Sequence, residues 1–326
     1  MLYDEYSYWK GAHFPEKILA MKNNLITAPI NLHLSLTDIC NNRCYYCYVK
    51  EQCNNNNSTL KKEVVLKLLN DAKEMNIKAI ELTGGGEPTA HPYFYEILDH
   101  MKKHQFDVGL TTNGYNIEPS KLLWLKWIRF SIDSFEPNMY KTIRHANILD
   151  IKKLTPLFNS EVIVGVSCVI NKYNYLKITE FVKKAKNYGF NNAWLKPVKI
   201  NGVSDIPTEK LDYINEQIDI AKTYADENFK VFSPTSEEEE KLPFARCLQQ
   251  EMCSYIDADG SVYPCCSLQG MKEFAIGNLN KEAYQKIWNN KKSIAVEKCP
   301  LDCFWWEKNV FLNYLIESSP KHVNFI

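Results

Sequence analysis

The stretch Ile30-Asn31-Leu32-His33-Leu34-Ser35-Leu36, followed by Cys40-Asn41-Asn42-Arg43-Cys44-Tyr45-Tyr46-Cys47, organises the chain. Its first part is an apolar run typical of a β-strand, so the three cysteines lie in the loop that leaves the strand's C-terminal end. Three thiols with gaps of three and two residues can converge on one metal centre, whereas an odd triplet leaves one thiol of a disulfide framework unpaired. A cluster of four irons held by three protein ligands keeps one open coordination site.

The overall composition excludes several classes of protein. The chain has 326 residues, of which 45% are hydrophobic and 24% are charged, and its net charge is zero. These values describe a soluble globular protein with room for one large α/β domain and a smaller appendage. A neutral chain gives no electrostatic basis for binding nucleic acid. We find no run of eighteen apolar residues and no signal-peptide core in Met1 to Lys10, so we expect no membrane span.

The cysteine content indicates the compartment. Eleven cysteines is a high count for this length, and most of them stand in tight groups. Such grouping favours metal ligation in a reducing compartment over secreted disulfides. We therefore expect a cytoplasmic protein.

From residue 30 the hydrophobic pattern alternates between strands and helices. Strands are expected at Ile30–Leu36, Lys78–Leu82, Asp107–Thr111, Trp127–Ile132, Glu161–Ile170 and Asn192–Lys196. Helices are expected at about Ser58–Asn76, Pro92–Lys103, Pro119–Leu125, Ile148–Phe158, Tyr175–Tyr188 and Thr208–Asn228. Six such units predict parallel strands joined by crossover helices, although the pattern alone does not decide whether the sheet closes.

Three segments make up the expected domain organisation: an N-terminal extension (1–29), an α/β domain (30–235) and a C-terminal lobe (236–326). The extension contains one expected helix, Pro15–Asn23. In the lobe, Asp259-Gly260 predicts a two-residue hairpin turn, and the helices expected there are at about Lys281–Asn290 and Phe304–Ile316.

The first cysteine group admits two interpretations. A zinc site would need a fourth ligand, for which Cys53 is conceivable. The spacing Cys40, Cys44, Cys47 after the first strand resembles the signature of the radical S-adenosylmethionine (SAM) superfamily. That resemblance implies a partial (β/α)6 TIM-like barrel and a 4Fe-4S cluster whose open iron binds SAM. It further implies reductive cleavage of SAM to a 5′-deoxyadenosyl radical that abstracts a substrate hydrogen.

The same resemblance implies a set of SAM-binding residues. Tyr46 matches the aromatic residue that packs on the adenine. Gly85, Gly86 and Glu87 match the Gly-Gly-Glu element, whose backbone approaches the SAM amino group where a Cβ would block it. The remaining positions follow later strands, where parallel barrels build their sites. They are Asn113, Ser131 and Asp133 (the last two for the ribose), Arg144 (for the SAM carboxylate) and Ser167 (for the nucleoside pocket).

A second cysteine group lies in the C-terminal lobe. Cys247, Cys265, Cys299 and Cys303 suit a complete four-thiolate site, for which structural zinc is common. The sequence from Asp259 to Cys265, with Ile276-Gly277-Asn278-Leu279 and Ile287-Trp288, resembles the SPASM/twitch extensions of radical SAM enzymes. This resemblance implies that the four thiolates hold one auxiliary 4Fe-4S cluster, with a second such cluster as the alternative.

Two further thiols, Cys253 and Cys266, are either incidental buried residues or catalytic hydrogen donors. A thiol beside Cys265 that returns a hydrogen atom to a substrate radical would resemble the radical SAM epimerases.

We therefore expect a radical SAM enzyme that oxidises, by dehydrogenation or cross-linking, a sugar-type small molecule or a peptide. The alternatives are redox-neutral epimerisation and a non-enzymatic zinc-binding interaction protein. The thirty or so residues before the first strand are few for a peptide-recognition module, which favours a small molecule or a peptide presented by a partner. An electron donor such as flavodoxin or ferredoxin is also expected.

Overall fold

The computed structural model describes residues 7–47, 49, 57–200, 203–233, 244–299, 303 and 305–317. The chain divides into two compact units. One, which we name the lobe unit, comprises 1–33, 63–78 and 237–326; the other, the sheet unit, comprises 34–62 and 79–236. The N-terminal segment thus belongs to the same compact unit as the C-terminal one. The domain boundaries expected after residues 29 and 235 stay predictions.

The sheet unit contains a parallel sheet, as the alternating pattern predicted. Its strands, in hydrogen-bonded order, are β2 (Ala79–Leu82), β3 (Asp107–Thr112), β4 (Trp127–Ser131), β5 (Ile163–Ile170), β6 (Asn192–Pro197) and β9 (Lys230–Phe232). Its helices are α4 (Phe94–Lys103), α5 (Pro137–Arg144), α6 (Thr155–Phe158), α7 (Ile178–Tyr188) and α8 (Leu211–Lys222). Strands β7 (Lys199–Ile200) and β8 (Val203–Ser204) pair antiparallel in a separate sheet. Strand β1 (Asn31–Leu34) spans the point where the two units meet in sequence.

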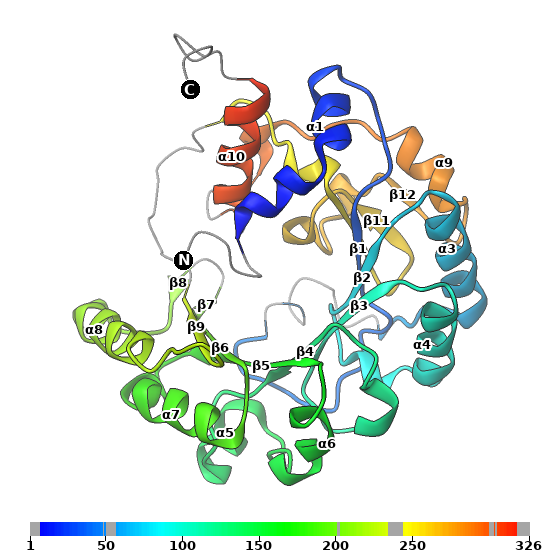
Figure 1. Ribbon diagram of the computed structural model, residues 1–326. Coiled ribbons are helices and arrows are strands. Elements are labelled where there is room, and N and C mark those ends of the chain that lie inside the picture. Colours follow the sequence, from blue (N-terminus) through cyan, green and yellow to red (C-terminus); the bar gives the residue numbers. More distant parts are fainter. Residues whose placement is uncertain are drawn as a thin grey trace. The chain divides into compact units, whose positions relative to one another are not determined.

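The strands curve into an arc whose outer side carries the helices (Figure 1). Helix α7 shows why the helices pack against the sheet. Its apolar residues recur at helical spacing, and all of them are buried: Ile178, Phe181, Val182 and Ala185. The helix ends at Gly189, whose φ of +97° is a left-handed conformation that favours glycine. An apolar stripe of this kind covers one face of the sheet and leaves the other face for different residues.

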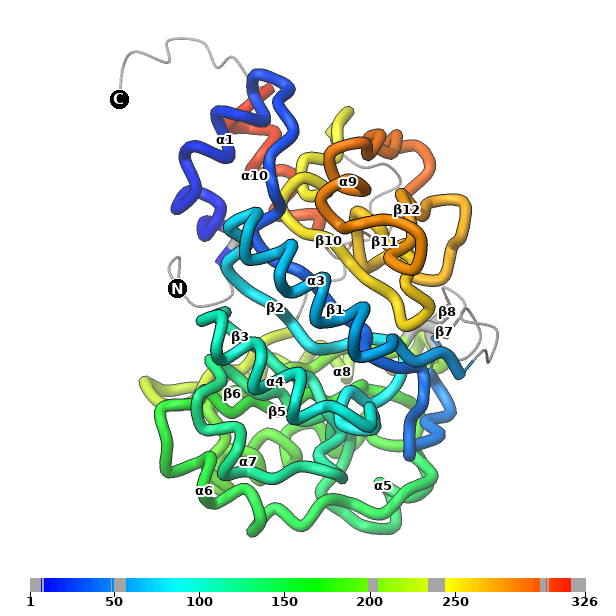
Figure 2. Tube along the Cα trace, turned by 90° about the vertical axis from the view of Figure 1, so that its right-hand side faces the viewer, coloured from blue at the N-terminus to red at the C-terminus, as the bar shows by residue number. Residues whose placement is uncertain are grey.

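The lobe unit combines the two ends of the chain. Its elements are α1 (Pro15–Lys22), α3 (Lys62–Glu74), β10 (Cys253–Ile256), β11 (Ser261–Tyr263), β12 (Gly277–Asn278), α9 (Tyr284–Asn289) and α10 (Trp306–Ile316). Strands β10, β11 and β12 pair antiparallel. Helices α1 and α10 lie side by side (Figure 2), and Met21, Phe311 and Leu312 pack in one apolar cluster with Met252. Within the described residues, no helix combines the length and apolar character needed to cross a bilayer.

Two local expectations were wrong, and one helix was not expected. The expected helix Pro119–Leu125 is a short 3-10 turn, Pro119–Leu122. Helix α5, which has only two turns, is missing from the expected helices because so short an element shows little periodicity. The hairpin loop has three residues instead of two: Asp257 N–H donates to Ser261 O at 2.9 Å, and Gly260 takes the left-handed position with φ +86°.

Candidate functional site

The three clustered cysteines of the sheet unit all lie half-buried in an irregular loop. A turn closes it, since Cys47 N–H donates to Cys44 O at 3.2 Å. Burial raises the pKa of Cys44 to about 11, an effect that nearby Arg144 opposes and that the neighbouring Asp133, Cys47 and Cys40 reinforce. The Cys44 thiol must therefore release a proton when it binds a metal.

The end of helix α5 holds this loop in place. The last carbonyls of a helix have no partner inside the helix. Here Ile143 O accepts from Tyr45 N–H at 3.2 Å and Arg144 O accepts from Arg43 N–H at 3.0 Å. The helix stops at this point because His145 adopts the left-handed conformation, with φ +50°. The N–H groups of the cysteine loop therefore bind the last carbonyls of α5, a helix that the sequence pattern did not reveal.

The glycine element packs against the segment that leads into the cysteine loop. Gly86 N–H donates to Thr37 O at 2.8 Å, and Glu87 N–H donates to Ile39 O at 2.9 Å. A Cβ on Gly86 would lie 2.3 Å from Ile39 O. Gly84 has φ +121°, and a Cβ there would lie 2.3 Å from the Ser35 Cβ. The close approach of the 35–39 segment therefore requires glycine at both positions, and Gly84 belongs to the same contact as Gly86.

The buried Glu87 side chain accepts hydrogen bonds from several neighbouring groups. Its carboxylate accepts from Thr112 Oγ1 (2.5 Å), Asn113 N–H (2.7 Å), Thr89 Oγ1 (2.8 Å) and Thr89 N–H (3.2 Å). Burial raises the pKa of this carboxyl, and the donors oppose that shift. The carboxylate joins the ends of β2 and β3, so a positioning role is what the geometry supports; contact with SAM stays a prediction.

Asn113 connects the third strand's end to the cysteine loop. Its Nδ2 donates to Asn41 Oδ1 at 2.7 Å and lies 3.9 Å from Cys40 Sγ. Its Oδ1 accepts from Tyr115 N–H at 3.0 Å. The structure thus brings together Asn113 and the first cysteine, which are far apart in sequence.

Asp133 and Arg144 form a buried ion pair with each other. Arg144 Nε and Nη2 donate to the two Asp133 oxygens at 2.8 and 3.1 Å, and the side chains are 6% and 0% exposed. Tyr46 Oη donates to the same carboxylate at 2.5 Å, and Val169 N–H donates at 2.9 Å. These partners differ from the ribose and SAM carboxylate expected for the two residues, and both of those roles stay predictions.

The two serines expected in the nucleoside pocket are direct neighbours. Ser131 and Ser167 face each other across β4 and β5, and both are half-exposed. Since neighbouring parallel strands lie about 4.8 Å apart, their hydroxyls share one small area at the strand ends. This arrangement agrees with a common ligand.

The second cysteine group lines one cavity inside the lobe unit. Cys247, Cys265, Cys299 and Cys303 line a small, partly open pocket whose other walls include Pro264, Leu268 and Trp305. Burial raises the pKa of Cys299 to about 11 and of Cys303 to about 12, and the nearby Cys247 and Cys265 thiols add to both shifts. Within the described residues, no three His, Cys, Asp or Glu side chains converge closely enough to hold a single metal ion.

Asn309 of α10 fixes the Cys247 end of this cavity. The residue is wholly buried, and its Oδ1 accepts from the N–H groups of Leu248 and Gln249 at 2.8 and 2.9 Å. Its Nδ2 lies 3.6 Å from Cys247 Sγ. No motif in the sequence marks Asn309, because its partners lie about sixty residues earlier.

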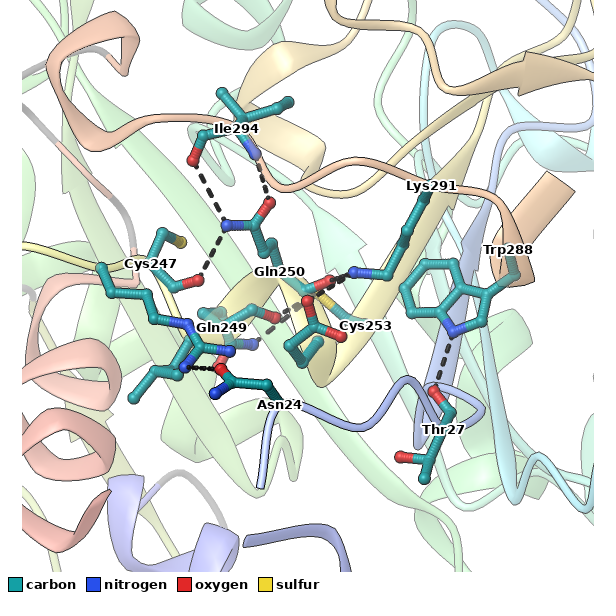
Figure 3. Close-up of polar contacts among 12 residues, drawn as sticks. Asn24, Thr27, Cys247, Gln249, Gln250, Cys253, Trp288, Lys291 and Ile294 are labelled. Atoms are coloured by element: carbon teal, nitrogen blue, oxygen red, sulfur yellow. Dashed lines mark hydrogen bonds and ion pairs between the residues drawn. The ribbon is translucent and has the colours of Figure 1, made fainter. Parts of the chain in front are cut away.

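Gln250 and Glu251 connect the Cys247 segment to the segment that precedes Cys299 (Figure 3). Gln250 Nε2 donates to Cys247 O and Ile294 O at 2.9 and 3.3 Å, and its Oε1 accepts from Ile294 N–H at 2.8 Å. Lys291 donates to Glu251 at 2.6 Å, and these side chains are only 1% and 8% exposed. Sequence reasoning missed both residues, which carry no local signal.

The two candidate hydrogen donors differ in access. Cys253 is 1% exposed, and Gln249 Nε2 donates to its sulfur at 3.6 Å. Cys266 is half-exposed and begins the 3-10 turn that follows Cys265. Of the two residues, Cys266 is the more exposed. Cys53, the conceivable fourth ligand of a zinc site, lies outside the described residues.

Comparison with known proteins identifies the family. The model of the radical SAM superfamily matches residues 34–212, and that of SPASM, an iron-sulfur cluster-binding domain, matches residues 247–309. The chain belongs to the radical SAM superfamily and carries a C-terminal SPASM domain.

Two curated relatives differ in how much of the chain they match. The tungsten-containing aldehyde ferredoxin oxidoreductase cofactor-modifying protein of Pyrococcus furiosus is 26% identical over 321 residues, covering 88% of this chain and 85% of that protein. A probable GTP 3′,8-cyclase of Pyrococcus abyssi is 34% identical over 137 residues, but these are 39% of this chain and 44% of that protein.

Solved structures show the same fold. Streptococcus suis SuiB bound to SAM has 16% identity and a TM-score of 0.66, covering 89% of this chain and 73% of that one. Native anSMEcpe with bound SAM has 16% identity and a TM-score of 0.63, covering 86% and 88%. The partial barrel expected from the sequence is therefore confirmed.

The cofactors are SAM and two 4Fe-4S clusters, as these domains imply. The residues present fit them: one cavity is walled by four thiols and apolar groups, and a separate loop carries three thiols. We assign Cys40, Cys44 and Cys47 to the catalytic cluster, and Cys247, Cys265, Cys299 and Cys303 to the auxiliary one, as proposals.

Replacing Gly86 by Ala is expected to damage the cysteine loop. The new Cβ must displace the Ile39 carbonyl, 2.3 Å away, so unfolding free energy should fall by about 2 kcal/mol or more, with loss of catalytic-cluster iron. Denaturant unfolding and iron counts measure both effects. Gly11→Ala is the matched control, because its nearest contacts are side-chain atoms at 3.4 Å or more. An unchanged Gly86→Ala protein would contradict the backbone contact.

Replacing Arg144 by Met is expected to lower unfolding free energy by about 3 kcal/mol or more, since it leaves the Asp133 carboxylate buried without its cation. Adding Asp133→Leu should recover part of the loss, which a double-mutant cycle in denaturant measures. Lys177→Met, which breaks an exposed pair with Glu180, is the control and should leave the unfolding midpoint unchanged. Additive losses at Asp133 and Arg144 would show that the pair does not couple.

Lys291→Met should selectively deplete the auxiliary site. It leaves Glu251 buried and unpaired beside Gln250, so the segment before Cys299 shifts and about four irons per chain are lost. Iron analysis and electron paramagnetic resonance of each reduced cluster measure this. Lys286→Met, which breaks an exposed pair with Glu282, should keep both clusters. Equal loss of the two cluster signals would contradict a local effect.

Proposed function

We propose that this chain cleaves SAM reductively and oxidises its substrate by two electrons. In chemical terms, one electron from a donor such as flavodoxin or ferredoxin splits SAM into methionine and a 5′-deoxyadenosyl radical, which takes a substrate hydrogen atom and leaves as 5′-deoxyadenosine. The substrate radical then loses one electron and one proton, which gives a dehydrogenated or cross-linked product.

The four-thiol cavity is the observation that supports oxidation. Four protein thiolates complete the coordination of a four-iron cluster and leave no iron to bind substrate. What such a site can still do is accept an electron. Its apolar walls, Pro264, Leu268 and Trp305, make the surroundings less polar and so limit the reorganisation that electron transfer requires.

The sheet unit supplies the other half of the reaction. The three-thiol loop is held by the carbonyls at the end of α5, by the Gly86 contact and by Asn113. A loop held from three sides keeps one geometry while a ligand completes the fourth position. Tyr46, whose hydroxyl is bound to Asp133, is fixed beside the third thiol, where it can pack on the adenine of SAM.

Epimerisation is the second candidate, and the half-exposed Cys266 beside Cys265 favours it. In that reaction the substrate radical would take a hydrogen atom from the thiol, and no electron would leave. The buried, hydrogen-bonded Cys253 is a poorer donor.

The substrate is proposed to be a small molecule, with a peptide as the alternative. The Pyrococcus furiosus relative that matches along most of this chain is described by its modification of a cofactor, which supports a small molecule. SuiB bound to the precursor peptide SuiA supports the peptide only through a shared fold, at 16% identity.

Reduced, reconstituted full-length protein is expected to form 5′-deoxyadenosine from SAM, and Cys40→Ala should abolish it. With candidate small molecules and peptides, turnover in deuterated water separates the reactions. Oxidation adds no solvent deuterium at the reacting carbon, whereas epimerisation by a thiol adds one. Cys266→Ala should spare oxidation and stall epimerisation. Absence of 5′-deoxyadenosine from protein with about eight irons per chain would overturn the proposal.

A further inference from the structure

The sulfur of Cys247 faces several N–H donors within the lobe unit. Burial raises the pKa of this thiol, and the N–H groups of Gln250, Asn309 and Gln249 oppose the rise because they favour the thiolate. Two of these donors belong to the backbone. The third is the side-chain Nδ2 of Asn309, which lies 3.6 Å from Cys247 Sγ. The surroundings of Cys247 therefore suit a sulfur that carries negative charge.

The other end of the Asn309 amide fixes its orientation. Its Oδ1 accepts from the N–H groups of Leu248 and Gln249 at 2.8 and 2.9 Å. An amide oxygen accepts and an amide nitrogen donates, so a flipped side chain would place Nδ2 against two other donors. Nδ2 must therefore face the sulfur. The residue is wholly buried, where a hydrogen bond is electrostatically stronger than in water.

We propose that Asn309 raises the reduction potential of the auxiliary cluster through its hydrogen bond to the ligand Cys247. This inference rests on the proposed function, in which that cluster accepts an electron. A reduced cluster carries one more negative charge, part of it on the thiolate sulfurs, so an N–H donor stabilises the reduced state more than the oxidised one. Asn309 is then a positioning residue, which acts through the sulfur and favours electron transfer from the substrate radical.

Cys265 shows why Asn309 is the donor to test. The sulfur of Cys265 accepts from the backbone N–H of Ser267 at 3.4 Å, a donor that a side-chain substitution leaves in place. The donor from Asn309 belongs to a side chain, so a substitution removes it. The Asn309 hydrogen bond can therefore be deleted while the four thiols stay unchanged.

Asn309→Asp separates the two contacts of this amide. The carboxylate keeps an oxygen for the N–H groups of Leu248 and Gln249, but it replaces the Nδ2 donor by an oxygen that repels the thiolate. The one-electron equilibrium of the auxiliary cluster should shift about tenfold or more toward the oxidised form, a fall of about 59 mV in midpoint potential. Anaerobic redox titration of the reconstituted full-length protein, followed by electron paramagnetic resonance, measures this shift. The catalytic cluster should keep its midpoint and serves as the internal reference.

Asn313→Asp is the matched control, because it makes the same change one turn further along α10. Asn313 Nδ2 donates to two backbone carbonyls, Arg246 O and Asn309 O, at 2.9 Å each. This variant adds the same charge farther from the sulfur, so its shift should be several-fold smaller. Equal shifts in the two variants would reveal a long-range effect of charge and would overturn the proposal. An unchanged midpoint in Asn309→Asp would do the same.

Asn309→Ser, with Asn313→Ser as its control, decides the question if Asn309→Asp does not keep the auxiliary cluster. Serine is neutral and too short to replace the Nδ2 donor, so the midpoint should fall in the same direction by a smaller amount. Loss of the auxiliary cluster from both Asn309 variants, with retention in both Asn313 variants, would show a purely structural role and would also overturn the proposal. The titration needs neither SAM cleavage nor substrate, so this failure is distinguishable from a failure of the proposed function.

Discussion

The buried ion pair between Asp133 and Arg144 is the interaction on which the cysteine loop depends. It joins the end of β4 to the end of α5, and it also binds the hydroxyl of Tyr46 within the loop. Buried ion pairs contribute little net stability, because desolvation offsets their attraction. What this pair does is fix orientation. Its two parallel hydrogen bonds hold the end of α5 in place, and the carbonyls at that end accept hydrogen bonds from the N–H groups of Arg43 and Tyr45.

The two thiol sites are built by different means that suit different chemistry. The three-cysteine loop is irregular and is held by backbone hydrogen bonds and glycine contacts. The second pocket is lined by four thiols, and the amide side chains of Gln250 and Asn309 hold the Cys247 segment in its wall.

The local sequence was sufficient to predict most strands and to group the cysteines. Strands such as β3 and β5 carry continuous apolar or β-branched runs, and short cysteine spacings constrain which thiols can share a metal. The parallel sheet, the family and the cofactors were all predicted correctly from such patterns. Helix α5 and strand β9 were not predicted, because elements this short have too little periodicity to be distinguished from a loop.

The sequence by itself determined the chemistry: three thiols with an open position, a glycine element and a second set of four thiols. Only the tertiary structure decided how these parts are held. It paired Asp133 with Arg144, placed Gly84 and Gly86 against Ser35–Ile39, and joined Gln250 to Ile294. The physical reason is that hydrogen bonds between distant residues leave no periodic trace, since each depends on where the chain returns in space.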